Sequence, residues 1–160
     1  MLLFIVYGLR SGEVARLRLE DIDWALELLT LTRTKQYRSQ IYPLTHEVGN
    51  AIVRYLQEVR PGCDRREVFL TFNAPFRPLS AGALYHVTRS RFDHLGIHTP
   101  HRGPHALRHA CACRLLAEGF SLEAIGDHLG HQSPSSTRHY ARVDLAGLRE
   151  VARFDLGGLL

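Results

Sequence analysis

Proline, serine and glycine divide the segment from residue 104 to residue 130 into two short helices. Pro104 opens the first expected helix, because a proline in a first turn gives up no hydrogen bond. Gly119 follows its end, where glycine is favoured. Ser121 is the expected N-cap of the second helix, and Gly130 is its stop. The apolar residues between these signals recur with a helical period, so this part of the chain is expected to be helical.

Polar residues gather where these helices begin and end. His105 and Arg108 are three positions apart, so both project from one face of the opening turn, and His109 follows. A helix N-terminus offers free N–H groups and the positive end of the helix dipole, while arginine adds a planar fork that suits two phosphate oxygens. The expected ligand is therefore an anion. His131 comes directly after the second helix, and Tyr140 follows a serine-rich turn.

Three motifs in this region occur in a fixed order. Residues 105–109 read His-Ala-Leu-Arg-His, residues 129–131 read Leu-Gly-His, and residues 137–140 read Thr-Arg-His-Tyr. Together they resemble the second and the C-terminal motifs of the tyrosine recombinase (phage integrase) family, at that family's spacing. Residues 8–13, Gly-Leu-Arg-Ser-Gly-Glu, resemble its first motif, with Arg10 as a phosphate ligand and Glu13 as a structural partner. The resemblance covers nearly the whole chain and implies a site-specific DNA recombinase or integrase of the kind found in mobile elements.

The resemblance also implies a catalytic set of six residues: Arg10, Lys35, His105, Arg108, His131 and Tyr140. Tyr140 would be the nucleophile, because a tyrosine oxygen can store the DNA backbone as a 3′-phosphotyrosyl ester. Arg10 and Arg108 would bind the non-bridging phosphate oxygens, and His131 would add a hydrogen bond. His105 would accept the proton of the Tyr140 hydroxyl. The arginines and the lysine supply positive charge, so neither a metal ion nor another cofactor is expected.

The front of the chain changes to the period of a β-strand. Residues 26–32 and 40–44 are expected to form an antiparallel hairpin whose polar turn, residues 34–38, carries Lys35. The resemblance implies that this lysine protonates the leaving 5′-hydroxyl. The glycines usual beside it are replaced by other residues, and Arg33 and Arg38 are alternative cations for the same role.

Two more helices are expected between this hairpin and residue 104. Thr45 is the expected cap of the first, and Ser80 is the expected cap of the second. The residues expected to face inward are Val48, Ile52, Val53, Leu56 and Val59 on the first helix, and Leu84, Val87, Phe92 and Leu95 on the second. A last amphipathic helix is expected at residues 144–154.

The implied fold class is mainly α with a small antiparallel β-hairpin or sheet, as in the catalytic domain of the family. A chain of 160 residues is long enough for one such domain. The family usually carries a separate N-terminal domain that clamps DNA, so residues 1–160 are expected to be a single, N-terminally truncated catalytic domain that binds DNA weakly. The expected partners are double-stranded DNA and further copies of the chain, assembled as a tetrameric synapse through the C-terminal helix. The alternative, that this helix packs back onto its own domain, stays open.

Composition says more about the cellular location of the protein than about its function. The net charge of +4 permits nucleic-acid binding without proving it. Three cysteines without paired spacing argue against a disulfide framework and suit a reducing cytosol. The apolar opening segment is too short to span a membrane, so a soluble, cytoplasmic protein is expected.

Other interpretations of these motifs remain open. The same pocket would suit a type IB topoisomerase-like enzyme, and a non-catalytic DNA-binding remnant would keep the fold without the reaction. His101, His105 and His109 stand at a spacing that could bind zinc. A metalloprotease helix needs a glutamate after the first histidine, however, and Arg108 would repel a cation. The DNA sequence that is recognised and the direction of strand exchange are not encoded in these motifs.

Overall fold

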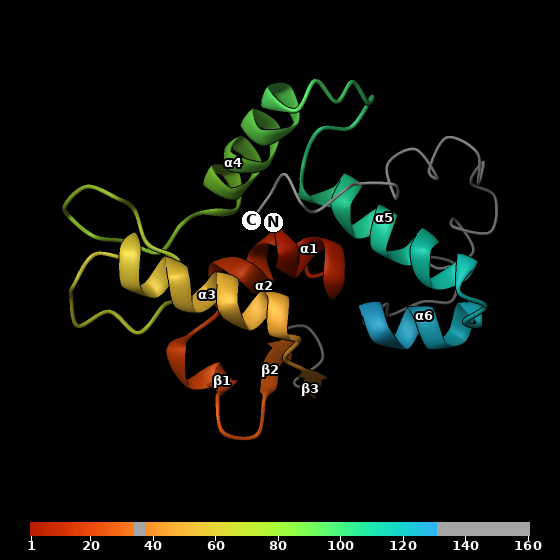
Figure 1. Ribbon diagram of the computed structural model, residues 1–160, viewed down its shortest axis with the longest axis horizontal. Helices are drawn as coiled ribbons and strands as arrows, with labels where there is room; N and C mark the ends of the chain where they lie inside the picture. Colours follow the sequence, from red (N-terminus) through yellow and green to blue (C-terminus); the bar gives the residue numbers. More distant parts are fainter. Residues whose placement is uncertain (34–37, 131–160) are drawn as a thin grey trace. The chain divides into compact units, whose positions relative to one another are not determined.

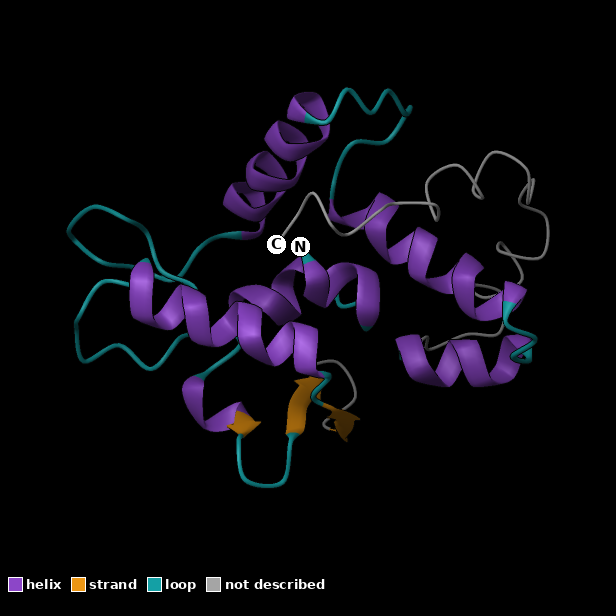
Figure 2. Cartoon of the chain, in the orientation of Figure 1, coloured by secondary structure: helices purple, strands orange, loops and turns teal. Residues whose placement is uncertain are grey.

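Two compact units make up the chain. The computed structural model describes residues 1–33 and 38–130. We call Met1–Arg10 with Gly96–Leu160 the terminal unit, and Ser11–Leu95 the central unit. Figure 1 gives the helices and strands in chain order, and Figure 2 shows that helices dominate both units while the strands are confined to one short stretch. The mainly α class expected from the sequence is confirmed.

The central unit contains the sheet, whose three antiparallel strands lie in the order β1, β2, β3. The strands are β1 (Ile22–Asp23), β2 (Leu28–Arg33) and β3 (Arg38–Pro43). Leu29 pairs with Tyr42, and both side chains are buried. Since side chains alternate along a strand, Leu31 points to the same buried side as Leu29, while Thr32 is exposed. The hairpin predicted from the sequence is confirmed, with β1 as an additional edge strand.

The helices of the central unit are α2 (Ser11–Ala15), the short 3₁₀ helix η1 (Leu19–Asp21), α3 (His46–Glu58) and α4 (Ala81–His94). Among them, α2 contacts both α4 and β2. Ser80 caps α4 as predicted, since its Oγ accepts a hydrogen bond from the Ala83 N–H at 3.0 Å. Thr45 occupies the N-cap position of α3, but its side chain makes no capping bond. Val59 ends α3 and is 48% exposed, so its predicted burial is wrong.

The inward face of α4 differs from the predicted one. Leu84 and Phe92 are buried as expected, but Val87 is 54% exposed and Leu95 is 36% exposed. Thr88 takes the inward position instead, because residues 84, 88 and 92 are four apart and share one face. Burying its hydroxyl leaves no unpaired donor, since Oγ1 donates to the Leu84 carbonyl at 2.9 Å. A polar residue can therefore occupy a core position that the apolar pattern assigned to its neighbour.

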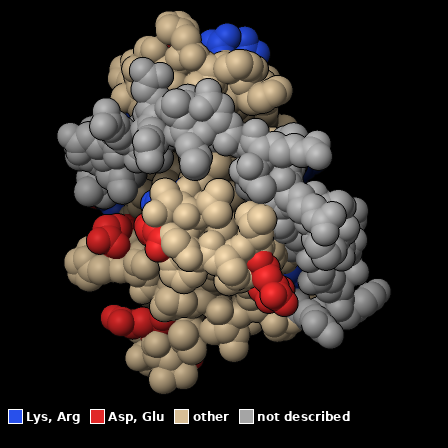
Figure 3. Space-filling view, turned by 90° about the vertical axis from the view of Figure 1, so that its right-hand side faces the viewer, with Lys and Arg blue, Asp and Glu red and all other residues tan. Residues whose placement is uncertain are grey.

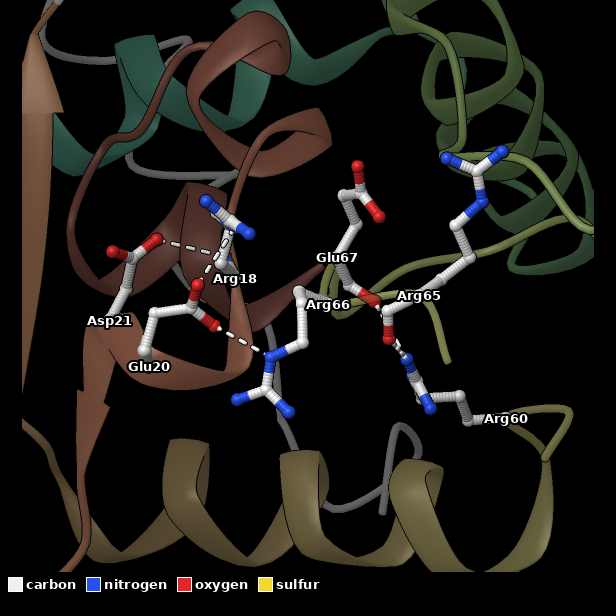
Figure 4. Close-up of polar contacts among 7 residues, drawn as sticks. All are labelled: Arg18, Glu20, Asp21, Arg60, Arg65, Arg66 and Glu67. Atoms are coloured by element: carbon white, nitrogen blue, oxygen red, sulfur yellow. Dashed lines mark hydrogen bonds and ion pairs between the residues drawn. The ribbon is translucent and has the colours of Figure 1, made fainter. Parts of the chain in front are cut away.

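A polar cluster on the central unit holds the segment after α3 in place (Figure 4). Arg60 donates to the carbonyl of Glu67 from both Nε and Nη2, at 3.3 and 3.2 Å. Arg66 pairs with the carboxylate of Glu20 at 3.3 Å, and Arg18 approaches the same carboxylate at 2.9 Å. These arginines are therefore engaged in ion pairs or loop contacts within the unit.

The terminal unit consists of three helices: α1 (Leu2–Val6), α5 (Pro104–Ala117) and α6 (Leu122–Leu129). Within this unit, α5 contacts both α1 and α6. The core between α5 and α6 includes the fully buried side chains of Ala112, Ile125 and Leu129. Pro104 stands in the first turn of α5, and the Ser121 Oγ accepts from the Ala124 N–H at 3.1 Å.

The ends of the terminal-unit helices largely match the sequence signals. Gly130 ends α6 in the left-handed conformation, with φ 62° and ψ 52°, and Gly119 has φ 89° just after α5. These boundaries confirm the predicted start and stop residues. In the first helix, α1 ends at Val6, and Gly8 then turns the chain with a φ of 62°. Across residues 1–33 and 38–130, no helix has the length and apolar character needed to cross a membrane.

Candidate active site

Arg108 is fixed inside the terminal unit by main-chain carbonyls. Its side chain is buried, with 5% exposed, on the second turn of α5. The guanidinium donates from Nη1 to the Gly8 carbonyl and from Nη2 to the Leu129 carbonyl, the latter at 2.8 Å. A buried charge is costly unless hydrogen bonds satisfy it, and these two bonds meet that need in part. The guanidinium therefore connects the turn after α1 with the last residue of α6.

Arg10 contacts the next carbonyl along the chain. Its Nη2 donates to the Gly130 carbonyl at 2.8 Å, and its side chain, unlike that of Arg108, is exposed. The last carbonyls of a helix lack intrahelical partners and carry the negative end of the helix dipole, so cations are favoured there. Two arginines that are far apart in the sequence thus meet at one end of α6. The structure brings together these two members of the predicted catalytic set.

Glycine is favoured at two points of this arrangement. Gly8 and Gly130 both have a φ of 62°, in the left-handed region that other residues rarely adopt. A Cβ atom on Gly8 would lie 2.3 Å from Cδ2 of Leu129, much closer than non-bonded carbons can approach. Gly8 and Gly130 also supply two of the carbonyls that hold the arginines. The glycines of the first motif and of Leu-Gly-His therefore shape the main chain around the guanidinium groups.

Of the other predicted site residues, the structure describes His105 but not the remaining three. His105 lies in the first turn of α5 and is exposed, so its ring is accessible to a ligand. Lys35, His131 and Tyr140 lie outside the described residues. The Gly130 carbonyl that accepts from Arg10 belongs to the peptide bond joining Gly130 to His131. The anchored helix end therefore leads directly into the segment that carries the predicted nucleophile.

A buried cluster in the central unit was not predicted from the sequence. Arg33, at the end of β2, donates from Nη2 to the Tyr42 hydroxyl at 2.7 Å. Its Nη1 lies 3.8 Å from Oε1 of Glu13 on α2. Glu13 therefore forms a buried ion pair with Arg33. The period of the strand carried a signal for this, since Arg33 continues the buried alternation of Leu29 and Leu31.

The burial of Arg33 helps to decide which cation of the hairpin would protonate the leaving 5′-hydroxyl. Arg33 was an alternative to Lys35, but its guanidinium is 5% exposed and faces Glu13 and Tyr42. A group held inward in this way is poorly placed to protonate a leaving DNA hydroxyl. Lys35 stays the predicted proton donor.

Cys111 is not an accessible nucleophile, and the described part of the chain holds no cluster of metal-ligating side chains. Cys111 is buried on α5, and its Sγ–H donates to the Val6 carbonyl at 3.4 Å. Burial raises the pKa of the Cys111 thiol to about 11, which keeps it protonated near neutral pH. In residues 1–33 and 38–130, no three metal-ligating side chains are grouped so that they could hold an ion.

Surface charge does not by itself mark a binding face. On the face drawn in Figure 3, the described acidic and basic side chains form separate spots on a mostly uncharged surface. This distribution agrees with the modest net charge of +4. The arginines that contact the end of α6 are therefore a more specific feature than the overall charge.

Known proteins resemble this chain over most of its length. The sequence profile of the phage integrase family matches residues 1–146. The chain belongs to the phage integrase family. This integrase-family chain is 41% identical over 157 residues to the Sinorhizobium fredii protein y4gC, which is named as an integrase/recombinase; the match covers 98% of the chain and 80% of y4gC. It is 32% identical over 154 residues to the tyrosine recombinase XerC of Thermodesulfovibrio yellowstonii, covering 93% of the chain and 50% of XerC.

Solved structures identify the fold of this integrase-family chain. The crystal structure of XerA recombinase superposes with a TM-score of 0.77 at 24% identity, over 93% of the chain and 54% of XerA. The post-cleavage complex of XerH with its difH substrate gives a TM-score of 0.73 at 22% identity, over 94% of the chain and 43% of XerH. The chain thus spans about half the length of these recombinases and of XerC. The family and the catalytic-domain fold predicted from the sequence are confirmed, and site-specific recombination fits them.

Proposed function

We propose that this chain breaks and rejoins double-stranded DNA at specific sites, with Tyr140 as the nucleophile and a 3′-phosphotyrosyl intermediate. One observation carries the proposal. Arg10 and Arg108, which the motifs assign to the scissile phosphate, both contact the end of α6, and the chain continues from there to His131 and Tyr140. Two guanidinium groups at one place match the charge of a phosphodiester.

The cleavage step exchanges one phosphate ester for another. The Tyr140 oxygen attacks the phosphorus, its proton passes to His105, and the bond to the 5′-oxygen breaks while Lys35 protonates that oxygen. A free phenol has a pKa of about 10, so a proton acceptor is needed near neutral pH. Arg10 and Arg108 stabilise the charge on the non-bridging oxygens, and His131 adds a hydrogen bond.

Rejoining reverses these events on another strand. The 5′-hydroxyl of the incoming strand attacks the phosphotyrosyl phosphorus and gives its proton to Lys35, which cleavage left neutral. The Tyr140 oxygen leaves with a proton returned by His105. The number of phosphodiester bonds is unchanged, so the reaction needs no external energy source. We infer that the positive charge of Arg10, Arg108 and Lys35 makes a metal ion unnecessary, and that four copies assemble on DNA through residues 144–154.

A suicide-substrate assay tests the proposal. The chain is incubated in EDTA with nicked duplexes from which the short fragment that bears the new 5′-hydroxyl dissociates after cleavage, so that the covalent complex accumulates. The expected result is a protein–DNA band on a denaturing gel. The band should be absent in Tyr140→Phe and present in the matched control Tyr85→Phe, which changes a tyrosine that is 41% exposed on α4.

The remaining outcomes separate the alternatives. A band that appears only after fusion to the DNA-clamping domain of a related recombinase would mean a sound active site with weak DNA binding. No band in either form would reject catalysis and leave a DNA-binding module. Relaxation of supercoiled DNA without strand exchange would indicate a topoisomerase-like enzyme instead. A measured mass of the protein–DNA complex that corresponds to fewer than four copies of the chain would reject the tetrameric assembly.

A further inference from the structure

The end of α6 holds both arginines through its main chain. The Leu129 carbonyl accepts from Arg108 at 2.8 Å, and the Gly130 carbonyl accepts from Arg10 at 2.8 Å. A third carbonyl, that of Gly8, accepts from the other terminal nitrogen of Arg108. We propose that Gly130 and Gly8 are positioning residues, whose left-handed conformations aim these carbonyls so that the two guanidinium groups are set for the scissile phosphate. This inference rests on the proposed function.

The geometry of Gly130 carries the first step. Its φ of 62° and ψ of 52° turn the chain at the end of α6 and direct its carbonyl toward Arg10. A residue with a side chain is strained there and gains by rotating φ to negative values, which turns the carbonyl away. Arg10 is exposed and would then lose a fixed partner. Its guanidinium would be held less firmly, and the phosphate would have to order it further.

Gly8 would position the buried Arg108, also through its carbonyl. Its carbonyl accepts a hydrogen bond from Arg108, and Gly8 lies so close to Leu129 that a Cβ atom at this position would be 2.3 Å from the Leu129 side chain. Gly8 and Leu129 thus bond the same guanidinium group while touching each other. The arrangement fixes Arg108 relative to α6 and leaves little space for an alternative rotamer.

The chain offers a matched control for Gly130. Gly96 follows α4 with a φ of 66°, and a Cβ atom there would meet nothing within 4 Å. Gly96→Ala therefore imposes the same left-handed strain as Gly130→Ala at a place without an arginine contact. Gly130→Asn is the conservative variant, because asparagine tolerates this conformation better than alanine does.

The first measurement observes the arginines without DNA. In ¹⁵N-labelled chain, the NMR signals of the Nη groups report whether rotation about the Cζ–Nη bond is slow, as in a bonded guanidinium, or fast. Arg10→Lys and Arg108→Lys assign the signals. We expect slow rotation for both arginines in the unchanged chain, and fast rotation of Arg10 alone in Gly130→Ala. Gly96→Ala should leave both slow, and Gly130→Asn should restore Arg10.

The second measurement is the single-turnover cleavage rate on the suicide substrate. Gly130→Ala should lower the rate by about 10- to 100-fold, because a misplaced charged group loses much of its effect on the transition state. Gly96→Ala should keep the rate, and both alanine variants should lose similar thermal stability. The inference would be overturned if the Arg10 signals in Gly130→Ala were unchanged. It would also be overturned if Arg10 rotated fast in this variant while the cleavage rate stayed the same. If the unchanged chain does not cleave DNA at all, the proposed function fails, while slow or fast rotation still decides whether Gly130 fixes Arg10.

Discussion

The Arg33 guanidinium lies 3.8 Å from the Glu13 carboxylate, with only 5% and 7% of the two side chains exposed. The contact connects α2 to the end of β2, and the Tyr42 hydroxyl accepts a further bond from Arg33 at 2.7 Å. Removing one partner of a buried ion pair leaves an uncompensated charge, which costs more than the pair itself contributes. The strand that leads to Lys35 therefore depends on a cluster that is distinct from the predicted catalytic set.

Replacing Arg33 should destabilise the fold strongly. We expect Arg33→Met to lower the free energy of unfolding by about 3 kcal/mol, because Glu13 stays buried without its cation. Glu13→Gln in the Arg33→Met background should recover part of the loss. Urea unfolding followed by circular dichroism measures both. Arg54→Met, which breaks an exposed pair with Glu58, should change stability by at most about 0.5 kcal/mol. Equal effects of the two arginine variants would contradict the prediction.

The two arginines proposed to bind the scissile phosphate should respond differently to alanine. Arg10 is exposed, so Arg10→Ala should lower the cleavage rate by about 10²- to 10³-fold and leave the melting temperature nearly unchanged. Arg108 is buried between two carbonyls, so Arg108→Ala should lower both the rate and the melting temperature. Calorimetry beside the cleavage assay separates the two effects. A melting temperature that falls equally in both variants would show that Arg10 also supports the fold.

Gly8→Ala should be the most destabilising glycine substitution among those tested. It combines left-handed strain, of about 1–2 kcal/mol, with overpacking against Leu129, of about 1–3 kcal/mol. Gly119→Ala carries the strain alone, since nothing lies within 4 Å of its Cβ position. Thermal unfolding of the two variants measures the difference. Similar melting temperatures would mean that Leu129 moves aside at little cost.

The hydroxyl of Ser80 should stabilise α4. Ser80→Ala removes the capping bond to the Ala83 N–H and should lower the free energy of unfolding by about 1 kcal/mol. Ser90 is exposed within the same helix, so Ser90→Ala is the control and should be neutral or slightly stabilising. Chemical denaturation resolves this difference. A loss in Ser90→Ala as large as that in Ser80→Ala would remove the capping explanation.

Stability should fall in alkaline solution because of Cys111. Burial raises the pKa of this thiol from 9.0 to about 11, so the folded state binds its proton more tightly than the unfolded state does. Below pH about 9 both states are protonated and the group has no effect on the pH dependence. Between pH 9 and 11 the unfolded chain ionises first, and the free energy of unfolding should fall by roughly 1 kcal/mol per pH unit. The same titration of Cys111→Ala should lack this slope, and an identical slope would contradict the assignment.

Local signals in the sequence were sufficient for most helix boundaries. Pro104, Ser80, Ser121 and Gly130 act on their own helix ends, so their effect can be predicted without knowing what packs nearby. The inward face of α4 was harder, because its apolar residues fit more than one stripe. The buried stripe is the one that contains Thr88, because its hydroxyl forms a hydrogen bond within the helix. An apolar pattern cannot reveal such a bond.

The motifs led to a predicted set of site residues, but they did not predict the contacts that Arg10 and Arg108 make. The partners of Arg10 and Arg108 are carbonyl oxygens, which every residue carries and which leave no mark in the sequence. The pairing of Arg33 with Glu13 joins residues from different elements and depends on how the chain folds back. The places of Lys35, His131 and Tyr140 in the site stay predictions.

Because Arg10 and Arg108 contact main-chain oxygens, α6 should tolerate substitutions better than insertions or deletions during evolution. A carbonyl is present whatever side chain occupies position 129, so another apolar residue there could keep the bond to Arg108. An insertion or deletion within α6 is different, because each residue turns a helix by about 100° and would carry both carbonyls away from the arginines together. The number of residues in α6 should therefore be inherited more strictly than their identity.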